Sequence, residues 1–188
     1  PILLTVGIGL IPLVRNYNDH ALAETAVNKK KRWFWGHIIS GAAFGVGILA
    51  TFCIGAYLST TTAFGWALAG VPLAAIGGSL LAAGLGADGI GPVALQNVNQ
   101  PAQLFFDGSH KLVPGVFIAG SVLFGLGQIL LVSGINHTTL LTAPLQIIVL
   151  LAATGMSLAS AIPSGWGLYI VALLTWLIYL PLAASVSF

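Results

Sequence analysis

Charged side chains are scarce in this 188-residue chain: Asp, Glu, Lys and Arg make up 5% of it, whereas hydrophobic residues make up 57%. A soluble domain carries about 25% charged residues, so this composition cannot build a surface that faces water. Runs of about 20 apolar residues recur instead, and each is long enough to cross a bilayer as a helix. The alternating ten-residue segments typical of transmembrane barrels are missing. The composition therefore predicts an all-α integral membrane protein with one transmembrane domain over residues 1–188.

Other absences narrow the function. Cys53 is the only cysteine, which excludes an intrachain disulfide, and no His/Cys cluster predicts a metal site. No charged residue falls in the middle of a predicted helix, where proton pumps and cation antiporters need one. A buried lysine for retinal, an arginine row for voltage sensing and a phosphate-binding glycine loop are also missing. We do not expect the chain to be an enzyme on its own.

Apolar runs separated by prolines and short polar turns predict a compact bundle of about six transmembrane helices. Five are full-length, and the first is short or truncated. The predicted helices cover residues 1–14, 33–58, 63–86, 113–135, 140–162 and 166–185. The long connection between the third and fourth helices, residues 87–112, is predicted to be an interfacial segment, because long ordered loops usually have a task.

The charges predict the orientation. With these helices, all ten charged side chains fall on one side of the membrane, in the loops 15–32 and 87–112. Basic residues remain beside anionic cytoplasmic headgroups, and indoles favour the interface. We therefore expect both loops on the cytoplasmic (or matrix or stromal) face and the C-terminus on the opposite one, with no nucleic-acid partner. The residues interpreted as orientation anchors are Lys29, Lys30, Lys31, Arg32, Trp33 and Trp35.

Two further patterns predict contact surfaces. Small residues four apart in the third helix form a ridge that permits close helix packing, or that receives a partner subunit, a lipid tail or a flat cofactor. This ridge consists of Gly70, Ala74, Gly78, Ala82 and Gly86. The interfacial segment carries uncharged hydrogen-bonding groups and aromatic rings, suited to a surface helix, a docking surface, or a lid over a quinone or lipid headgroup. Its candidate residues are Gln96, Asn97, Asn99, Gln100, Phe105 and Phe106.

Two histidines are cofactor candidates. His37 lies one turn inside the second predicted helix, and His110 lies at the entrance to the fourth, on the same side. Two imidazoles on facing helices are the ligand set of a b-type haem in a membrane protein. A hydrogen-bonded interfacial histidine is the more common arrangement.

We expect the chain to be a non-catalytic subunit packed within a larger membrane complex, in contact with lipids and other membrane subunits. Too few polar groups for a transport path and too small an extramembrane portion for an enzyme domain favour this role. One alternative is a redox subunit that binds a b-type haem or a quinone near the cytoplasmic face. Another is a small transporter or channel for a neutral solute.

Overall fold

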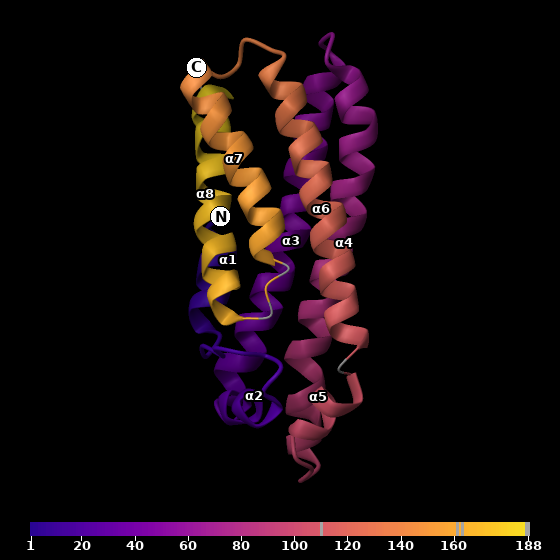
Figure 1. Cartoon of the computed structure of the whole chain (residues 1–188), viewed down its shortest axis with the longest axis vertical. Helices are drawn as coiled ribbons and strands as arrows, with labels where there is room; N and C mark the ends of the chain where they lie inside the picture. Colours follow the sequence, from indigo (N-terminus) through magenta and orange to yellow (C-terminus); the bar gives the residue numbers. More distant parts are fainter. Residues whose placement is uncertain (110, 161, 163, 187–188) are drawn as a thin grey trace.

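The computed structural model describes residues 1–109, 111–160, 162 and 164–186, in which eight helices and no strand are found. Five of these helices, α3, α4, α6, α7 and α8, are long and apolar enough to cross a membrane, and they stand side by side (Figure 1). The chain is thus the predicted all-helical bundle and fits an integral, multi-pass membrane protein. The helices are α1 (Ile2–Leu10), α2 (His20–Val27), α3 (Lys30–Ser59), α4 (Phe64–Asn97), α5 (Gln103–Ser109), α6 (Leu112–Asn136), α7 (Ala143–Ser160) and α8 (Gly165–Val186).

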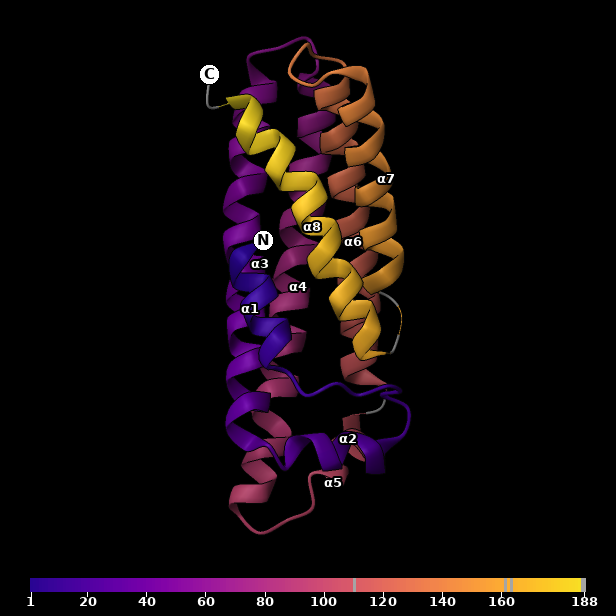
Figure 2. The ribbon, with the colours of Figure 1, turned by 90° about the vertical axis from the view of Figure 1, so that its left-hand side faces the viewer.

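The spanning helices differ in length. α3 has 30 residues and α4 has 34, so they are about 45 Å and about 51 Å long, well beyond a hydrocarbon core of about 30 Å. α7 has 18 residues and is about 27 Å long. At one end of the bundle α3 and α4 therefore extend past α7, and α2 and α5 lie beside these extensions (Figure 2).

This end contains the two polar stretches of the sequence and is called the charged end below. His20 Nδ1 of α2 lies 2.6 Å from Asp107 Oδ1 of α5. Gln96 Nε2, near the end of α4, donates a hydrogen bond to Asn28 Oδ1 at 3.0 Å. These contacts place the two polar stretches at the same end of the bundle, as the charge distribution predicts.

Neighbouring helices follow one another around a ring in the order α1, α3, α4, α6, α7 and α8, and α8 packs back against α1. The seam between α4 and α6 is very tight. A β-carbon on Gly120 would lie 3.1 Å from the carbonyl oxygen of Gly77, and one on Gly127 would overlap Ala74. Close backbone approach of this kind allows helices to associate in lipid, which offers no hydrophobic drive.

The small-residue ridge of α4 takes part in these seams. Gly70, Ala74 and Gly78 are buried, and added β-carbons at the two glycines would meet side chains of α6 or α3. Ala82 lies against α3, whereas a β-carbon on Gly86 would meet nothing within 4 Å. The first three residues are therefore used for packing within the chain and present no surface to a partner.

Contacts between α1 and α8 close the ring. Trp176 Nε1 donates a hydrogen bond to Thr5 Oγ1 at 2.9 Å. At the charged end, the amide of Gly165 donates to the carbonyl oxygen of Val14 at 2.8 Å. Two segments far apart in the sequence thus form one wall of the bundle.

α1 ends at Leu10, earlier than the predicted residue 14, because Ile11 adopts an extended backbone and Pro12 follows. Arg32, in the first turn of α3, caps this end. Its Nε donates to the Leu10 carbonyl oxygen at 3.1 Å, and its Nη2 reaches that of Gly9 at 3.5 Å. A cation at a helix C-terminus satisfies free carbonyls and complements the helix dipole.

The largest difference from the sequence-based expectation concerns α4. Its predicted end at residue 86 is wrong, because the helix continues to Asn97 with Pro92 inside it. Proline has no N–H, so the carbonyl of Asp88, one turn earlier, lacks its helical donor. Trp33 Nε1 donates to this oxygen at 2.7 Å instead. The helix continues because a side chain of α3 replaces the hydrogen bond that proline removes.

This bond also corrects the interpretation of Trp33 as an interfacial anchor. Trp33 is completely buried, whereas Trp35 is 54% exposed. Lys29 directly precedes α3, and Lys30 and Lys31 lie in its first turn with Arg32. The cations and Trp35 remain at the surface, and Trp33 belongs to the core of the charged end.

Candidate functional site

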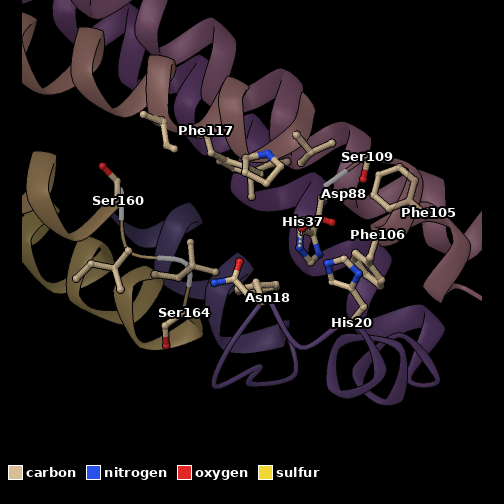
Figure 3. Close-up of a pocket in the computed structure, with 17 residues that line it drawn as sticks. Asn18, His20, His37, Asp88, Phe105, Phe106, Ser109, Phe117, Ser160 and Ser164 are labelled. Atoms are coloured by element: carbon tan, nitrogen blue, oxygen red, sulfur yellow. Dashed lines mark ion pairs between the residues drawn. The ribbon is translucent and has the colours of Figure 1, made fainter. Parts of the chain in front are cut away.

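A cavity of ≈ 570 Å³ lies inside the charged end, between α4, α6 and the start of α8. Figure 3 shows that Asn18, just before α2, and Phe105 and Phe106 of α5 lie along the edge of the cavity. Its wall combines aromatic and aliphatic side chains with a few polar groups. The described residues that line it are Tyr17, Asn18, His20, His37, Leu85, Asp88, Phe105, Phe106, Ser109, Val113, Pro114, Phe117, Ile118, Ser160, Ile162, Ser164 and Leu168.

His37 and Asp88 meet at the wall of this cavity (Figure 3). His37 Nδ1 lies 2.7 Å from the carbonyl oxygen of Trp33, one helical turn earlier. Because a carbonyl only accepts hydrogen bonds, Nδ1 carries a proton. His37 Nε2 lies 3.3 Å from Asp88 Oδ2, and both residues are buried. We call this pair the His37–Asp88 couple.

The surroundings keep the couple in place. The indole of Trp33 packs on the imidazole of His37 with ring centroids 4.4 Å apart, and the same indole binds the Asp88 carbonyl. A β-carbon on Gly89 would lie 2.7 Å from His37 Cβ, so glycine at this position lets α3 and α4 approach. Pro92, Trp33 and Gly89 together hold the His37–Asp88 couple at the level of the bundle where α7 ends.

Tyr17 is the other polar group of interest. Its hydroxyl oxygen is buried and has no hydrogen-bond partner. Burial raises the pKa of Tyr17 above its ordinary value, and the negative charges of Asp88 and Tyr169 raise it further. The hydroxyl therefore remains protonated at neutral pH, as a buried donor without an acceptor.

The edge of the cavity is formed by α5 and the start of α2. His20 and Asp107 connect them through the 2.6 Å contact described above. Phe106 is buried against this contact and meets the Trp33 ring edge-on, with centroids 6.2 Å apart. Phe105 packs against Gly91 of α4. The aromatic rings therefore continue from the core of the charged end to the cavity.

Only some of the predicted site residues lie at the cavity. His37, Phe105 and Phe106 line the cavity, and His110 lies outside the described residues. The other four residues of the predicted interfacial segment lie apart from the cavity, at the end of α4 and in the turn after it. Gln96 binds Asn28, Asn97 Oδ1 accepts from Lys30 Nζ, the Gln100 amide donates to the Leu95 carbonyl, and Asn99 has a φ of 59°.

A haem iron does not fit His37 as it stands, because both ring nitrogens already face oxygen atoms. Ligation through Nε2 would break the His37–Asp88 couple and leave the buried carboxylate without its partner, at a cost of several kcal/mol. Within the described ranges, no group of three or more His, Cys, Asp or Glu side chains could hold a metal ion.

The sequence-based prediction of the site does not include Asp88, Tyr17 or the part of the cavity wall that α6 and α8 form. Asp88 was placed in a loop, although one pattern could have located it. Buried positions recur at Leu81, Leu85, Asp88 and Pro92, spaced three to four apart, so the buried face of α4 continues past residue 86. No local pattern marks an unpaired tyrosine hydroxyl, because only the folded chain shows what surrounds it.

No protein family, curated protein or solved structure matches this chain. The fold and the cavity are therefore the basis of the functional argument.

Proposed function

We propose that this chain is a non-catalytic membrane protein that binds a small amphipathic molecule of the bilayer, such as a quinone or a neutral lipid, at its charged end. The cavity carries this proposal. Its volume of ≈ 570 Å³ falls within the range of about 300–1,000 Å³ of small-molecule sites, and such sites combine apolar walls with a few convergent polar groups.

The charges of the wall favour a neutral ligand. No Lys or Arg is among the described lining residues, so an anionic headgroup would find no fixed positive charge and would approach Asp88. The cavity also lies where α7 ends and α8 begins, at the depth where headgroups meet hydrocarbon. An amphipathic molecule could place its polar end between these helices and keep its tail in lipid.

Such a binding role suits a non-catalytic subunit that holds a ligand inside a larger membrane complex. Following the excess of basic residues in the loop before α3, we place the charged end on the cytoplasmic (or matrix or stromal) side. The C-terminal end of α8 then lies on the opposite side.

A channel for a neutral solute receives less support from the interior of the bundle. Gln128 Nε2 of α6 donates to Thr51 Oγ1 of α3 at 3.2 Å, and the Tyr179 hydroxyl of α8 donates to Gln128 Oε1 at 3.3 Å. These groups satisfy one another and tie three helices together. Polar side chains in the middle of the bundle thus serve as links between helices.

A cavity-filling variant tests the proposal. Leu168→Trp places a larger ring in the wall, whereas Leu173→Trp, on the same helix, changes a side chain that is 62% exposed on the outer surface. Each protein is purified from its native membrane in mild detergent, and its bound small molecules are extracted and identified by mass spectrometry. We expect one kind of neutral amphipathic molecule to be bound at about one molecule per chain in the wild type and in L173W, and to be lost from L168W. Equal lipid and quinone contents in all three proteins would refute the proposal.

A further inference from the structure

Arg32 is exposed where α1 meets α3, on the outer wall of the bundle (Figure 2). Its Nε and Nη2 donate to the carbonyl oxygens of Leu10 and Gly9, so one edge of the guanidinium is occupied by the end of α1. Nη1 forms no hydrogen bond within the described part of the chain. The second edge, between Nη1 and Nη2, therefore remains open. Such an edge matches two oxygens of a phosphate or a carboxylate.

The chain itself supplies no counter-ion at this edge. Among the described residues, no Asp or Glu carboxylate pairs with Arg32, and the acidic–basic contacts found there involve histidines. Residues 15–32 contain five basic side chains and only two acidic ones, and one of these two, Asp19, caps the start of α2. The excess of positive charge around the open edge attracts an anion from outside the chain.

An apolar surface leads up to the guanidinium. Leu3, Val6 and Gly9 are exposed and three positions apart, so they share one face of α1. A β-carbon on Gly9 would meet nothing within 4 Å, which leaves open space at the turn whose carbonyl Arg32 binds. Trp35, one turn after Arg32 in α3, is 54% exposed. Indoles favour the boundary between headgroups and hydrocarbon, so the open edge lies at the level of the headgroups.

We propose that the open edge of the Arg32 guanidinium binds the phosphate of an anionic phospholipid, whose acyl chains lie along the exposed face of α1. The basic excess of residues 15–32 selects an anionic lipid, because it repels the ammonium group of a zwitterionic one. An acidic protein segment suits the surface less, since the apolar face of α1 requires a hydrocarbon partner. Arg32 does not line the cavity, so this lipid site is independent of the proposed cavity ligand.

Calorimetric titration of the purified protein in mild detergent tests the proposal. The probes are dioctanoylphosphatidylglycerol, which is anionic, and dioctanoylphosphatidylcholine, which has the same acyl chains and a zwitterionic head. We expect the wild type to bind the anionic lipid about tenfold more tightly, and Arg32→Gln to remove this preference, because one hydrogen bond to a charged group contributes roughly that factor. Equal affinities of the wild type for the two lipids would overturn the proposal without the use of any variant.

Lys31→Gln is the matched control, since it removes the same charge at an exposed position about 100° around the helix from Arg32. It should change the affinity for the anionic lipid by about twofold at most. Equal weakening in K31Q and R32Q would indicate diffuse attraction to the basic end and would refute a site at Arg32.

Arg32→Lys separates lipid binding from the cap of α1. Lysine keeps a cation at the helix end but lacks the two-donor edge, so R32K should melt as the wild type does and bind the anionic lipid more weakly. Wild-type affinity in R32K would contradict the proposal. Glycerophosphoglycerol, the same headgroup without acyl chains, should not displace the lipid at an equal concentration. Displacement would show a site for a soluble phosphate and would likewise refute the lipid.

Discussion

The bond between Trp33 and the Asp88 carbonyl offers a sharp test of how the charged end is built. Pro92 removes the helical donor of this carbonyl, and the Trp33 indole replaces it at 2.7 Å. Trp33→Phe leaves a buried acceptor unpaired, which costs about 1–3 kcal/mol. The smaller ring also leaves space at a fully buried position, for about 1–2 kcal/mol more. We expect a total loss of about 2–5 kcal/mol in the free energy of unfolding.

A double-mutant cycle isolates the hydrogen bond. Pro92→Ala restores an amide that can donate to the Asp88 carbonyl along α4, so Trp33→Phe should cost only its packing contribution in that background. The coupling energy between the two sites should therefore equal the cost of the unpaired acceptor, about 1–3 kcal/mol. Unfolding in mixed micelles with increasing sodium dodecyl sulfate, followed by circular dichroism, measures all four proteins. Trp35→Phe, at an exposed position, is the control and should change stability by less than about 0.5 kcal/mol. A W33F cost that is equal in both backgrounds would refute the idea that the indole replaces the bond lost at proline.

Three further outcomes follow from the structure. Gly89→Ala should destabilise the protein by about 1–3 kcal/mol in the same titration, because its β-carbon would lie 2.7 Å from His37 Cβ. Gly86→Ala is the control and should be neutral or stabilising, because its β-carbon would meet open space. Equal effects of the two substitutions on stability would contradict this view. Arg32→Gln should speed hydrogen exchange in α1, because the Arg32 guanidinium caps the last carbonyls of that helix. Lys31→Gln is the control, and unchanged exchange in R32Q would argue against the cap. The pKa of Tyr17 is raised in the folded state, so above a pH of about 10 the hydroxyl loses its proton when the protein unfolds. The wild type should therefore lose more stability than Y17F between about pH 10 and 11. Parallel profiles of stability against pH for the two proteins would refute this.

Much of the fold could be predicted from composition and charge. The long apolar runs predicted the spanning helices, and the grouping of Asp107 and Lys30 in distant polar stretches predicted that both lie at one end. The predicted end at residue 86 is wrong because α4 continues through Pro92. Proline normally interrupts an isolated helix, whereas here a donor 55 residues away in the sequence supplies the missing bond.

The site was less predictable, for the same reason. The position of His37 in the sequence predicts a candidate site residue, but the predicted helix end at residue 86 puts Asp88 in a loop, so the contact between the two is not predicted. Tyr17 and Leu168 enter the site only because α8 packs against α1. Such contacts depend on the order of helices around the ring, which local patterns do not contain.

The closure of the ring has a consequence for how the protein is made. The Ser164 hydroxyl binds the Arg15 carbonyl across 149 positions of sequence. At a synthesis rate of about 5–20 residues per second, roughly 7–30 s pass between the appearance of the two residues. During that time α1 and the Tyr17 segment are already present without the helix that completes their wall. The cavity is thus among the last features to form, and while it is incomplete, its polar groups remain open to water, lipid or an assembly factor.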